Sequence, residues 1–330
     1  MNGKSQPAPL VICFGEALMD RLGPPGGDPA ANASLCEDRL GGAPANVACA
    51  LARLGTASAF VGRLGCDAIG GAFARLFEAR GVDQTALQWD AERPSRIVLV
   101  RRDAEGERLF GGFAGDRGAG FADQALTTAG LTAPLGALLA RARWLVLGTI
   151  PLASPGAAHA LWMAVRQAAD AGVALAVDVN WRPVFWESDA DPAAGPTAVQ
   201  LQQIVPLLQQ AHLLKCTVEE ARWLFGSVDP GAISATLARG PLVVITDGPR
   251  PLRWGRAKGD NAILQPSAAA AVDSTGAGDA FMAGLLHGLC AAEGPLLEHM
   301  RVASACGALV CLGAGAIDPQ PTPEQVAAFL

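Results

Sequence analysis

The chain has 330 residues, of which 51% are hydrophobic and 17% are charged. This composition excludes a largely disordered protein, whose sequence would be more polar and more highly charged. No apolar run reaches the roughly 20 residues that cross a bilayer as a helix, so we expect no membrane span. The net charge of −6 argues against a nucleic-acid partner, because phosphate backbones are usually bound by a basic face.

The length allows either about two domains or one large domain with insertions. The first residues contain no apolar stretch of the kind found in a signal peptide, so we expect a short disordered lead and a cytoplasmic location. The eight cysteines form no CxxC pair, and no histidine lies at metal-ligand spacing from them. We therefore expect free thiols in a reducing compartment.

Five short apolar runs predict the central strands of a sheet, at residues 11–14, 59–61, 144–147, 175–177 and 242–245. Segments between these runs predict helices at residues 46–54, 69–80, 157–171 and 230–238. The alternation favours an α/β fold with a doubly wound, mostly parallel sheet that is flanked by helices. A Pro-rich segment, residues 187–196, is expected to be an exposed loop.

Two stretches interrupt this alternation, residues 19–40 and residues 95–113. The second contains two alternating runs around a Glu-Gly turn, which predicts an antiparallel hairpin. Because such a hairpin does not easily join a parallel sheet, we expect both stretches to form a small antiparallel β lid; a surface decoration explains them equally well. The α/β core would then comprise residues 10–18, 41–94 and 114–330.

The most informative motif is the run DSTGAGD at residues 273–279, which is followed directly by an apolar helical segment. The unpaired N–H groups in the first turn of a helix attract anions, so Gly276, Ala277 and Gly278 could form an anion hole. Asp279 would lie in that turn, where its carboxylate could take a proton from a hydroxyl that attacks a polyphosphate. Ordinary helix capping explains the same string, and it is the simpler interpretation of the motif taken alone.

A second motif, GGAPAN at residues 41–46, leads into another helical segment. Gly41 and Gly42, beside the amide of Asn46, could hydrogen-bond several hydroxyls of a neutral polyol. A Gly-Pro turn that ends in an Asn cap accounts for this motif equally well.

Together, the two motifs resemble the two signatures of the ribokinase-like (pfkB) carbohydrate kinase family in their order and in their wide separation. Further family-like segments are GEALMD at 15–20, GRLGCDAIGG at 62–71, DVNWRPVFW at 178–186 and ACGALVCLGAGAI at 305–317. Within the family, the chain is most similar to fructokinases. The resemblance implies an α/β sandwich with a β lid that closes over a sugar. It also implies transfer of the γ-phosphoryl group of ATP, with Mg²⁺, to a sugar hydroxyl; the expected acceptor is the 6-hydroxyl of fructose.

The resemblance assigns roles to individual residues. Asp279 matches the catalytic base, and the backbone of Gly276, Ala277 and Gly278 matches the anion hole that holds charge on the transferring phosphoryl group. The matched sugar-binding positions are Asp20, Gly41, Gly42 and Asn46.

The segment KCTVEE at residues 215–220 resembles the family's Asn-x-x-Glu element, with Thr217 in place of the asparagine. Glu220 would organise Mg²⁺ and its waters near the phosphates, whereas an exposed acidic helix start is the simpler alternative. Gly248 matches a nucleotide loop, and Ser304 stands where fructokinases tend to have an asparagine near the adenine. The predicted nucleotide-binding residues are Lys215, Thr217, Glu220, Gly248 and Ser304.

Arg182 follows the strand predicted at residues 175–177 and so lies at the carboxyl edge of the sheet, where open α/β sheets bind ligands. We include it among the substrate-binding residues because a guanidinium can contact a phosphate with two nitrogen atoms. An ion pair with Asp178 is an equally simple interpretation.

Several alternatives stay open on the sequence alone. The acceptor could be ribose, 2-keto-3-deoxygluconate or a nucleoside, because the motifs do not fix the side chains around the sugar. A kinase-like scaffold protein without catalysis is a second alternative, which the presence of Asp279 and its glycines disfavours. The resemblance also leaves open a monovalent cation such as K⁺ near Asp273, and an exposed lid edge could pair two chains into a homodimer.

Overall fold

The computed structural model describes residues 10–25, 29–30, 33–102, 108–259, 261–267, 269–291 and 294–330. The predicted lead, residues 1–9, and the predicted Glu-Gly turn, residues 105–106, lie outside the described residues. Within the described ranges, no helix is long and apolar enough to cross a bilayer, and the cysteines form no disulfide.

The fold is organised around a sheet of nine strands. Their spatial order is β13 (Ala262–Leu264), β12 (Arg250–Gly255), β11 (Leu242–Asp247), β10 (Leu213–Thr217), β9 (Ala174–Asp178), β8 (Ala142–Leu147), β1 (Leu10–Phe14), β4 (Ser58–Gly65) and β5 (Leu87–Asp90). The strands from β11 to β5 pair in parallel, and only β12 and β13 are antiparallel to their neighbours. The predicted mostly parallel sheet is therefore confirmed.

Alternating side chains explain why this sheet is covered on both faces. In β1, Ile12 and Phe14 belong to one apolar core, whereas Val11 and Cys13 belong to the other. Because successive side chains of a strand point to opposite faces, a continuous apolar run needs a helical layer on each side. Strand β10 is not among the predicted strands, since Lys215 interrupts its apolar run.

Each face of the sheet carries its own layer of helices, as the two apolar cores require. The first face packs against α3 (Thr132–Leu139), α4 (Pro155–Asp170), α6 (Ala198–Leu208), α7 (Val218–Phe225) and α8 (Pro230–Thr236). The second face packs against α1 (Ala43–Arg53), α2 (Ala68–Arg80), α9 (Ala277–Ala291) and α10 (Leu296–Val310). The remaining helical segments are η1 (Ala33–Leu35), η2 (Ala122–Ala125), η3 (Ile150–Ala153), α5 (Pro183–Trp186) and α11 (Pro323–Phe329). The predicted loop at 187–196 contains no helix or strand.

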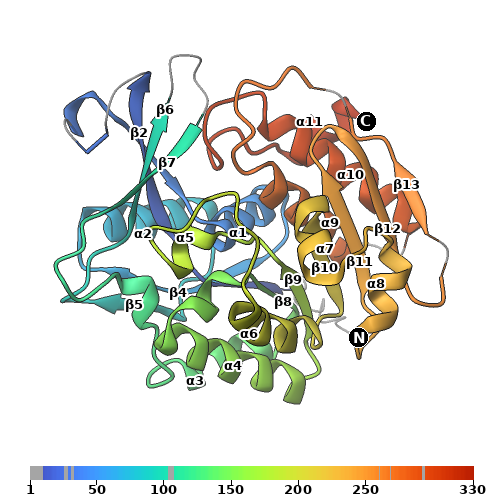
Figure 1. Ribbon diagram of the computed structural model, residues 1–330, viewed down its shortest axis with the longest axis horizontal. Helices are drawn as coiled ribbons and strands as arrows, with labels where there is room; N and C mark the ends of the chain where they lie inside the picture. Colours follow the sequence, from blue (N-terminus) through green and yellow to red (C-terminus); the bar gives the residue numbers. More distant parts are fainter. Residues whose placement is uncertain are drawn as a thin grey trace, which may run out of the picture.

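A smaller sheet projects from this body at the upper left of Figure 1. Its strand order is β3 (Glu37–Gly41), β2 (Leu18–Pro25), β6 (Ile97–Arg102) and β7 (Arg108–Ala114). The β2–β3 and β6–β7 pairs are antiparallel, as predicted, but the central pair β2–β6 is parallel. Both β2 and β6 follow core strands, β1 and β5, that run in the same direction, so both segments leave the core at the same edge.

Candidate active site

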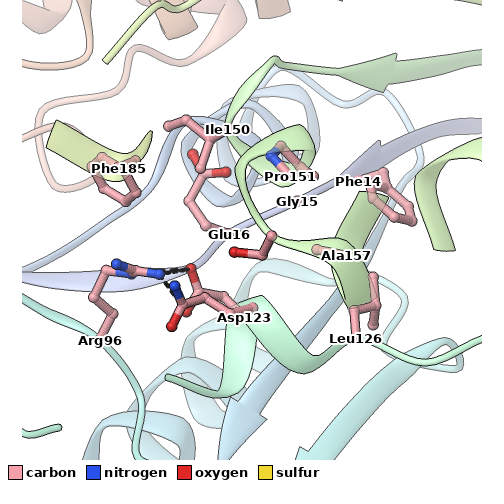
Figure 2. A pocket seen from close by; sticks show the side chains of 12 residues that line it. Phe14, Gly15, Glu16, Arg96, Asp123, Leu126, Ile150, Pro151, Ala157 and Phe185 are labelled. Carbon is pink, nitrogen blue, oxygen red and sulfur yellow. Dashed lines mark hydrogen bonds and ion pairs between the residues drawn. The ribbon is translucent and has the colours of Figure 1, made fainter. Parts of the chain in front are cut away.

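The candidate site lies where the carboxyl ends of β1, β8 and β9 meet the beginnings of α1 and α9. Two neighbouring cavities open there. We call the first the Asp279 cavity; its lining includes Glu16, Ala43, Ile150, Asp178, Asn180 and Asp279. We call the second the Arg96 cavity, drawn in Figure 2; its lining includes Glu16, Arg96, Asp123, Gln124, Ile150 and Phe185. Glu16 and Ile150 line both cavities, so the two adjoin.

The glycine motif places a helix start at the Asp279 cavity. Gly276 has a φ of +78°, and an added Cβ would lie 2.6 Å from the Cβ of Ala316, so only glycine fits there. Among the described residues, the N–H groups of Gly276, Gly278 and Asp279 have no acceptor. The N–H of Ala277 donates to the carbonyl oxygen of Ser274 at 3.2 Å, so it is the member of the predicted anion hole that already has a partner.

Asp279 faces Asn46 across the junction of α9 and α1. The Asn46 amide Nδ2 donates a hydrogen bond of 2.8 Å to Asp279 Oδ2. Helix α1 begins at Ala43, with Gly42 as its N-cap, so the alternative of Asn46 as a helix cap is wrong. Asn46 Oδ1 is buried and has no hydrogen-bond partner among the described residues. That oxygen is an acceptor that a ligand hydroxyl could satisfy.

Burial sets the protonation behaviour of Asp279. It raises the pKa of the Asp279 carboxyl to about 6, and the nearby Asp178 charge adds to the rise. The hydrogen bond from Asn46 and the positive charges of Lys215 and Arg182 oppose it. A carboxylate with a pKa near 6 is ionised at neutral pH and is a stronger base than an exposed aspartate, so it is suited to accept a proton.

A buried ion pair stands beside the start of α9. Lys215 Nζ, on β10, contacts Asp178 Oδ2, on β9, at 2.7 Å. Burial alone would lower the pKa of Lys215, but the Asp178 carboxylate reverses this effect and raises it, so the ammonium stays charged. A Cβ added to Gly278 would lie 3.2 Å from Lys215 Nζ, which places the ammonium directly against the helix start.

Arg182 does not form the ion pair with Asp178 that the sequence allowed, because Lys215 occupies that carboxylate. The Arg182 side chain is exposed, and its Nη1 donates to the carbonyl oxygen of Trp181 at 2.8 Å. Its charge nevertheless acts on Asp279, whose pKa it lowers.

Glu220 is buried, so its interpretation as an exposed acidic helix start is wrong. Its Oε1 accepts a hydrogen bond from the Trp181 N–H, and its Oε2 accepts one from the Thr217 N–H, both at 2.7 Å. Thr217 Oγ1 in turn accepts from the Glu220 N–H at 3.2 Å, which completes a capping box for α7. The carboxylate of Glu220 therefore fastens the segment after β9 to the end of β10.

None of the five predicted nucleotide-binding residues lines either cavity, and two of them, Gly248 and Ser304, belong to other parts of the fold. Gly248 is exposed in the turn between β11 and β12, where its φ of +56° favours glycine. Ser304 is buried in α10, and its Oγ accepts a hydrogen bond of 2.9 Å from the N–H of Ser267.

The predicted sugar-binding glycines permit close approaches between chain segments. A Cβ on Gly41 would lie 2.8 Å from Asp20 Oδ2, and a Cβ on Gly42 would lie 2.8 Å from the Glu16 carbonyl oxygen. Gly42 also has a φ of +101°, which a residue with a side chain rarely adopts. These contacts place Asp20, in β2 of the small sheet, next to the end of β3.

The cavity residues that escaped prediction include three charged ones, Glu16, Arg96 and Asp123. Glu16 is buried, and its Oε1 accepts a hydrogen bond of 3.2 Å from the Ala43 N–H. Burial raises the pKa of Glu16 to about 8, and the charges of Asp123 and Asp279 contribute. Its position two residues after an apolar strand was a usable signal, because the carboxyl ends of parallel strands bind ligands.

Comparison with known proteins identifies the family. Residues 8–323 match the model of the pfkB family of carbohydrate kinases. The chain is 32% identical to fructokinase-1 of Oryza sativa subsp. japonica over 99% of this chain and 98% of the rice protein.

Two solved structures resemble the fold over nearly its whole length. A fructokinase from Xylella fastidiosa with bound ATP superposes with a TM-score of 0.82 at 26% identity and 97% coverage of both chains. A fructokinase from Vibrio cholerae O395, solved with fructose, ADP and calcium ion, superposes with a TM-score of 0.79 at 26% identity, covering 98% of this chain and 99% of that one. Together with the match over residues 8–323, this likeness confirms the predicted family: the chain belongs to the pfkB family of carbohydrate kinases.

Proposed function

We propose that this protein transfers the γ-phosphoryl group of ATP to the 6-hydroxyl of fructose. Membership of the carbohydrate kinase family supports the class of reaction, and the likeness to fructokinases supports the acceptor. The single observation that carries the proposal is the carboxylate of Asp279, which lies at the start of α9 beside N–H groups that have no acceptor among the described residues. A base and an anion site next to each other are what phosphoryl transfer to a hydroxyl requires.

In the proposed reaction, Asp279 takes the proton of the acceptor hydroxyl while the hydroxyl oxygen attacks the γ-phosphorus. The new oxygen–phosphorus bond forms as the bond to the β-phosphate oxygen breaks, so ADP leaves with the electron pair of that bond. The N–H groups of Gly276 and Gly278, with the ammonium of Lys215, would stabilise the negative charge on the transferring group. Asn46 would hold the Asp279 carboxylate in position through its amide Nδ2.

We infer that Mg²⁺ enters as the complex with ATP and is held mainly by the phosphates. Within the described residues, no three His, Cys, Asp or Glu side chains form a group that could hold a metal ion. This agrees with the general behaviour of Mg²⁺, which uses few protein carboxylates and several phosphate and water oxygens. Both Glu220 oxygens accept backbone hydrogen bonds, so we assign Glu220 the role of positioning the segments around the metal.

The remaining expectations stay predictions. Asp273 is buried, and its carboxylate connects two loops: Oδ1 accepts hydrogen bonds from Thr275, and Oδ2 accepts one from the N–H of Gly315. The predicted K⁺ site would lie next to this carboxylate. The small sheet would act as the lid, formed by 19–40 and 95–113. Pairing of two lids into a homodimer and the cytoplasmic location also stay predictions.

An acceptor panel tests the proposed function. We expect the purified protein with MgATP to release ADP in the presence of fructose and to form fructose 6-phosphate, identified by mass spectrometry and by coupling to an enzyme specific for that product. Ribose, 2-keto-3-deoxygluconate and a nucleoside serve as competing acceptors. A higher kcat/KM with any of these would replace fructose as the acceptor. ATP binding without turnover of any acceptor would instead favour the scaffold interpretation.

The pH dependence of the reaction should report Asp279. Because its pKa is raised to about 6 and only the ionised carboxylate can accept a proton, kcat/KM for the acceptor should be constant just above neutral pH. Well below pH 6, kcat/KM should fall about tenfold for each pH unit, because protonation of Asp279 removes the base. Steady-state rates between pH 5 and pH 8 with saturating MgATP would measure this fall in kcat/KM. A kcat/KM that stays constant down to pH 5 would contradict the assignment.

A further inference from the structure

A second buried ion pair lies in the Arg96 cavity, at the base of the small sheet. Arg96 precedes β6, and Asp123 belongs to η2. Arg96 Nε donates to Asp123 Oδ2 at 3.1 Å, and Arg96 Nη2 donates to Asp123 Oδ1 at 3.2 Å. Only 4% of the Arg96 side chain and 7% of the Asp123 side chain are exposed. Figure 2 shows the guanidinium directed at the carboxylate, with Glu16 and Phe185 lining the same cavity.

Aromatic rings hold this guanidinium in place. The Cζ of Arg96 lies 4.8 Å from the ring centre of Phe113, 4.5 Å from that of Phe121 and 4.8 Å from that of Phe185. The rings also contact each other, with centre-to-centre distances of 5.1 Å between Phe113 and Phe185 and 6.0 Å between Phe113 and Phe121. A guanidinium fixed by two hydrogen bonds and three rings cannot turn toward a ligand without breaking these contacts.

The charges that line the two cavities favour an uncharged acceptor. Arg96 is the only basic side chain among the described residues that line either cavity. Four acidic side chains line the cavities: Glu16, Asp123, Asp178 and Asp279. Lys215 neutralises Asp178 and Arg96 neutralises Asp123. Burial raises the pKa of Glu16 to about 8, so this carboxyl is mostly uncharged at neutral pH, which leaves Asp279 to repel an anion. An acceptor carboxylate would therefore meet the negative charge of Asp279, and the guanidinium of Arg96 is already bound to Asp123.

We propose that the Arg96–Asp123 pair makes the acceptor site selective for neutral sugars against sugar acids, with Asp123 as the residue that keeps Arg96 from binding a carboxylate. The inference rests on the proposed function, because it assumes that the acceptor occupies these cavities. Discrimination of this kind comes from an unfavourable contact with the wrong substrate as much as from a favourable contact with the right one.

The test compares fructose with 2-keto-3-deoxygluconate, a six-carbon acid that also carries a 6-hydroxyl. We expect the wild-type protein to have a kcat/KM for fructose at least about 100-fold above that for the acid. Asp123→Asn keeps the shape of the side chain but frees the Arg96 charge. In this variant the ratio of kcat/KM for the acid to that for fructose should rise about tenfold or more, while the KM for ATP stays unchanged.

Two further variants isolate the cause. In the double variant Arg96→Gln, Asp123→Asn, no cation faces the cavity, so the ratio should return toward the wild-type value. Asp83→Asn serves as the matched control, because Asp83 pairs with Arg141 before β8, at the opposite edge of the sheet. That variant should leave the ratio unchanged. Thermal unfolding would confirm that each variant is folded.

The outcomes separate this inference from the proposed function. A wild-type protein that phosphorylates the acid better than fructose would overturn the inference but would leave a sugar kinase. An unchanged ratio in a folded Asp123→Asn variant would overturn it as well. If Asp123→Asn fails to fold, the wild-type preference for fructose over the acid and the ratio in the double variant still test the inference. Absence of turnover with every sugar would contradict the proposed function itself.

Discussion

Replacement of Asp279 by asparagine is expected to lower kcat for phosphoryl transfer by roughly 10²- to 10⁴-fold, the range that general-base catalysis supplies. Asparagine keeps the size of the side chain and can still hydrogen-bond with Asn46, but its amide cannot accept the proton of the attacking hydroxyl. The KM for ATP and the KM for fructose should change little, because the lost interaction acts in the transition state.

Initial rates with fructose and MgATP would measure this loss, and calorimetric titration would check that the variant still binds nucleotide. Asp170→Asn is a suitable control, since it removes the same charge from an exposed position at the end of α4. The assignment would be wrong if Asp279→Asn kept full activity. A variant that lost nucleotide binding along with activity would instead assign Asp279 to the binding of ATP.

Replacement of Lys215 by methionine is expected to lower the free energy of unfolding by about 3 kcal/mol, as expected when one partner of a buried ion pair is removed, and also to reduce kcat strongly. The loss of stability follows from the burial of Asp178, whose carboxylate would stand without its counter-ion. The loss of activity has a different cause, because the Lys215 ammonium lies against Gly278 at the start of α9. There it would stabilise charge on the transferring phosphoryl group.

The double variant Lys215→Met, Asp178→Asn separates these two effects. With both charges removed, stability in urea unfolding should recover to within about 1 kcal/mol of the wild type. The activity should stay low, because no ammonium remains beside the helix start. Recovery of activity together with stability would show that Lys215 acts only as a structural counter-ion, and would remove it from the proposed catalytic machinery.

Local sequence patterns predicted much of the fold. The apolar runs of β1, β4, β8, β9 and β11 predicted central strands because a strand that is covered on both faces has no polar side. Four strands of the large sheet escaped prediction: β10 and β12 contain basic residues, and β5 and β13 are short edge strands. The register of the small sheet could not be predicted either, since the parallel pairing of β2 with β6 joins two distant insertions.

The sequence by itself determined the family, the helix start at residues 273–279 and the candidate base Asp279. Each depends on short-range properties, namely glycine backbone freedom and the polarity of a helix N-terminus, which a local string encodes. It also placed Arg182 at the carboxyl edge of the sheet, because this residue follows a strand that the apolar pattern predicts.

Only the tertiary structure decided which charges meet. Asp178 pairs with Lys215 and not with Arg182, although Arg182 is nearer in the sequence, because β9 and β10 are adjacent strands. Arg96 meets Asp123 only where the base of the small sheet packs against η2. The strength of an ion pair and the pKa of a buried carboxyl depend on distances and burial created by packing, and the order of residues along the chain does not specify them.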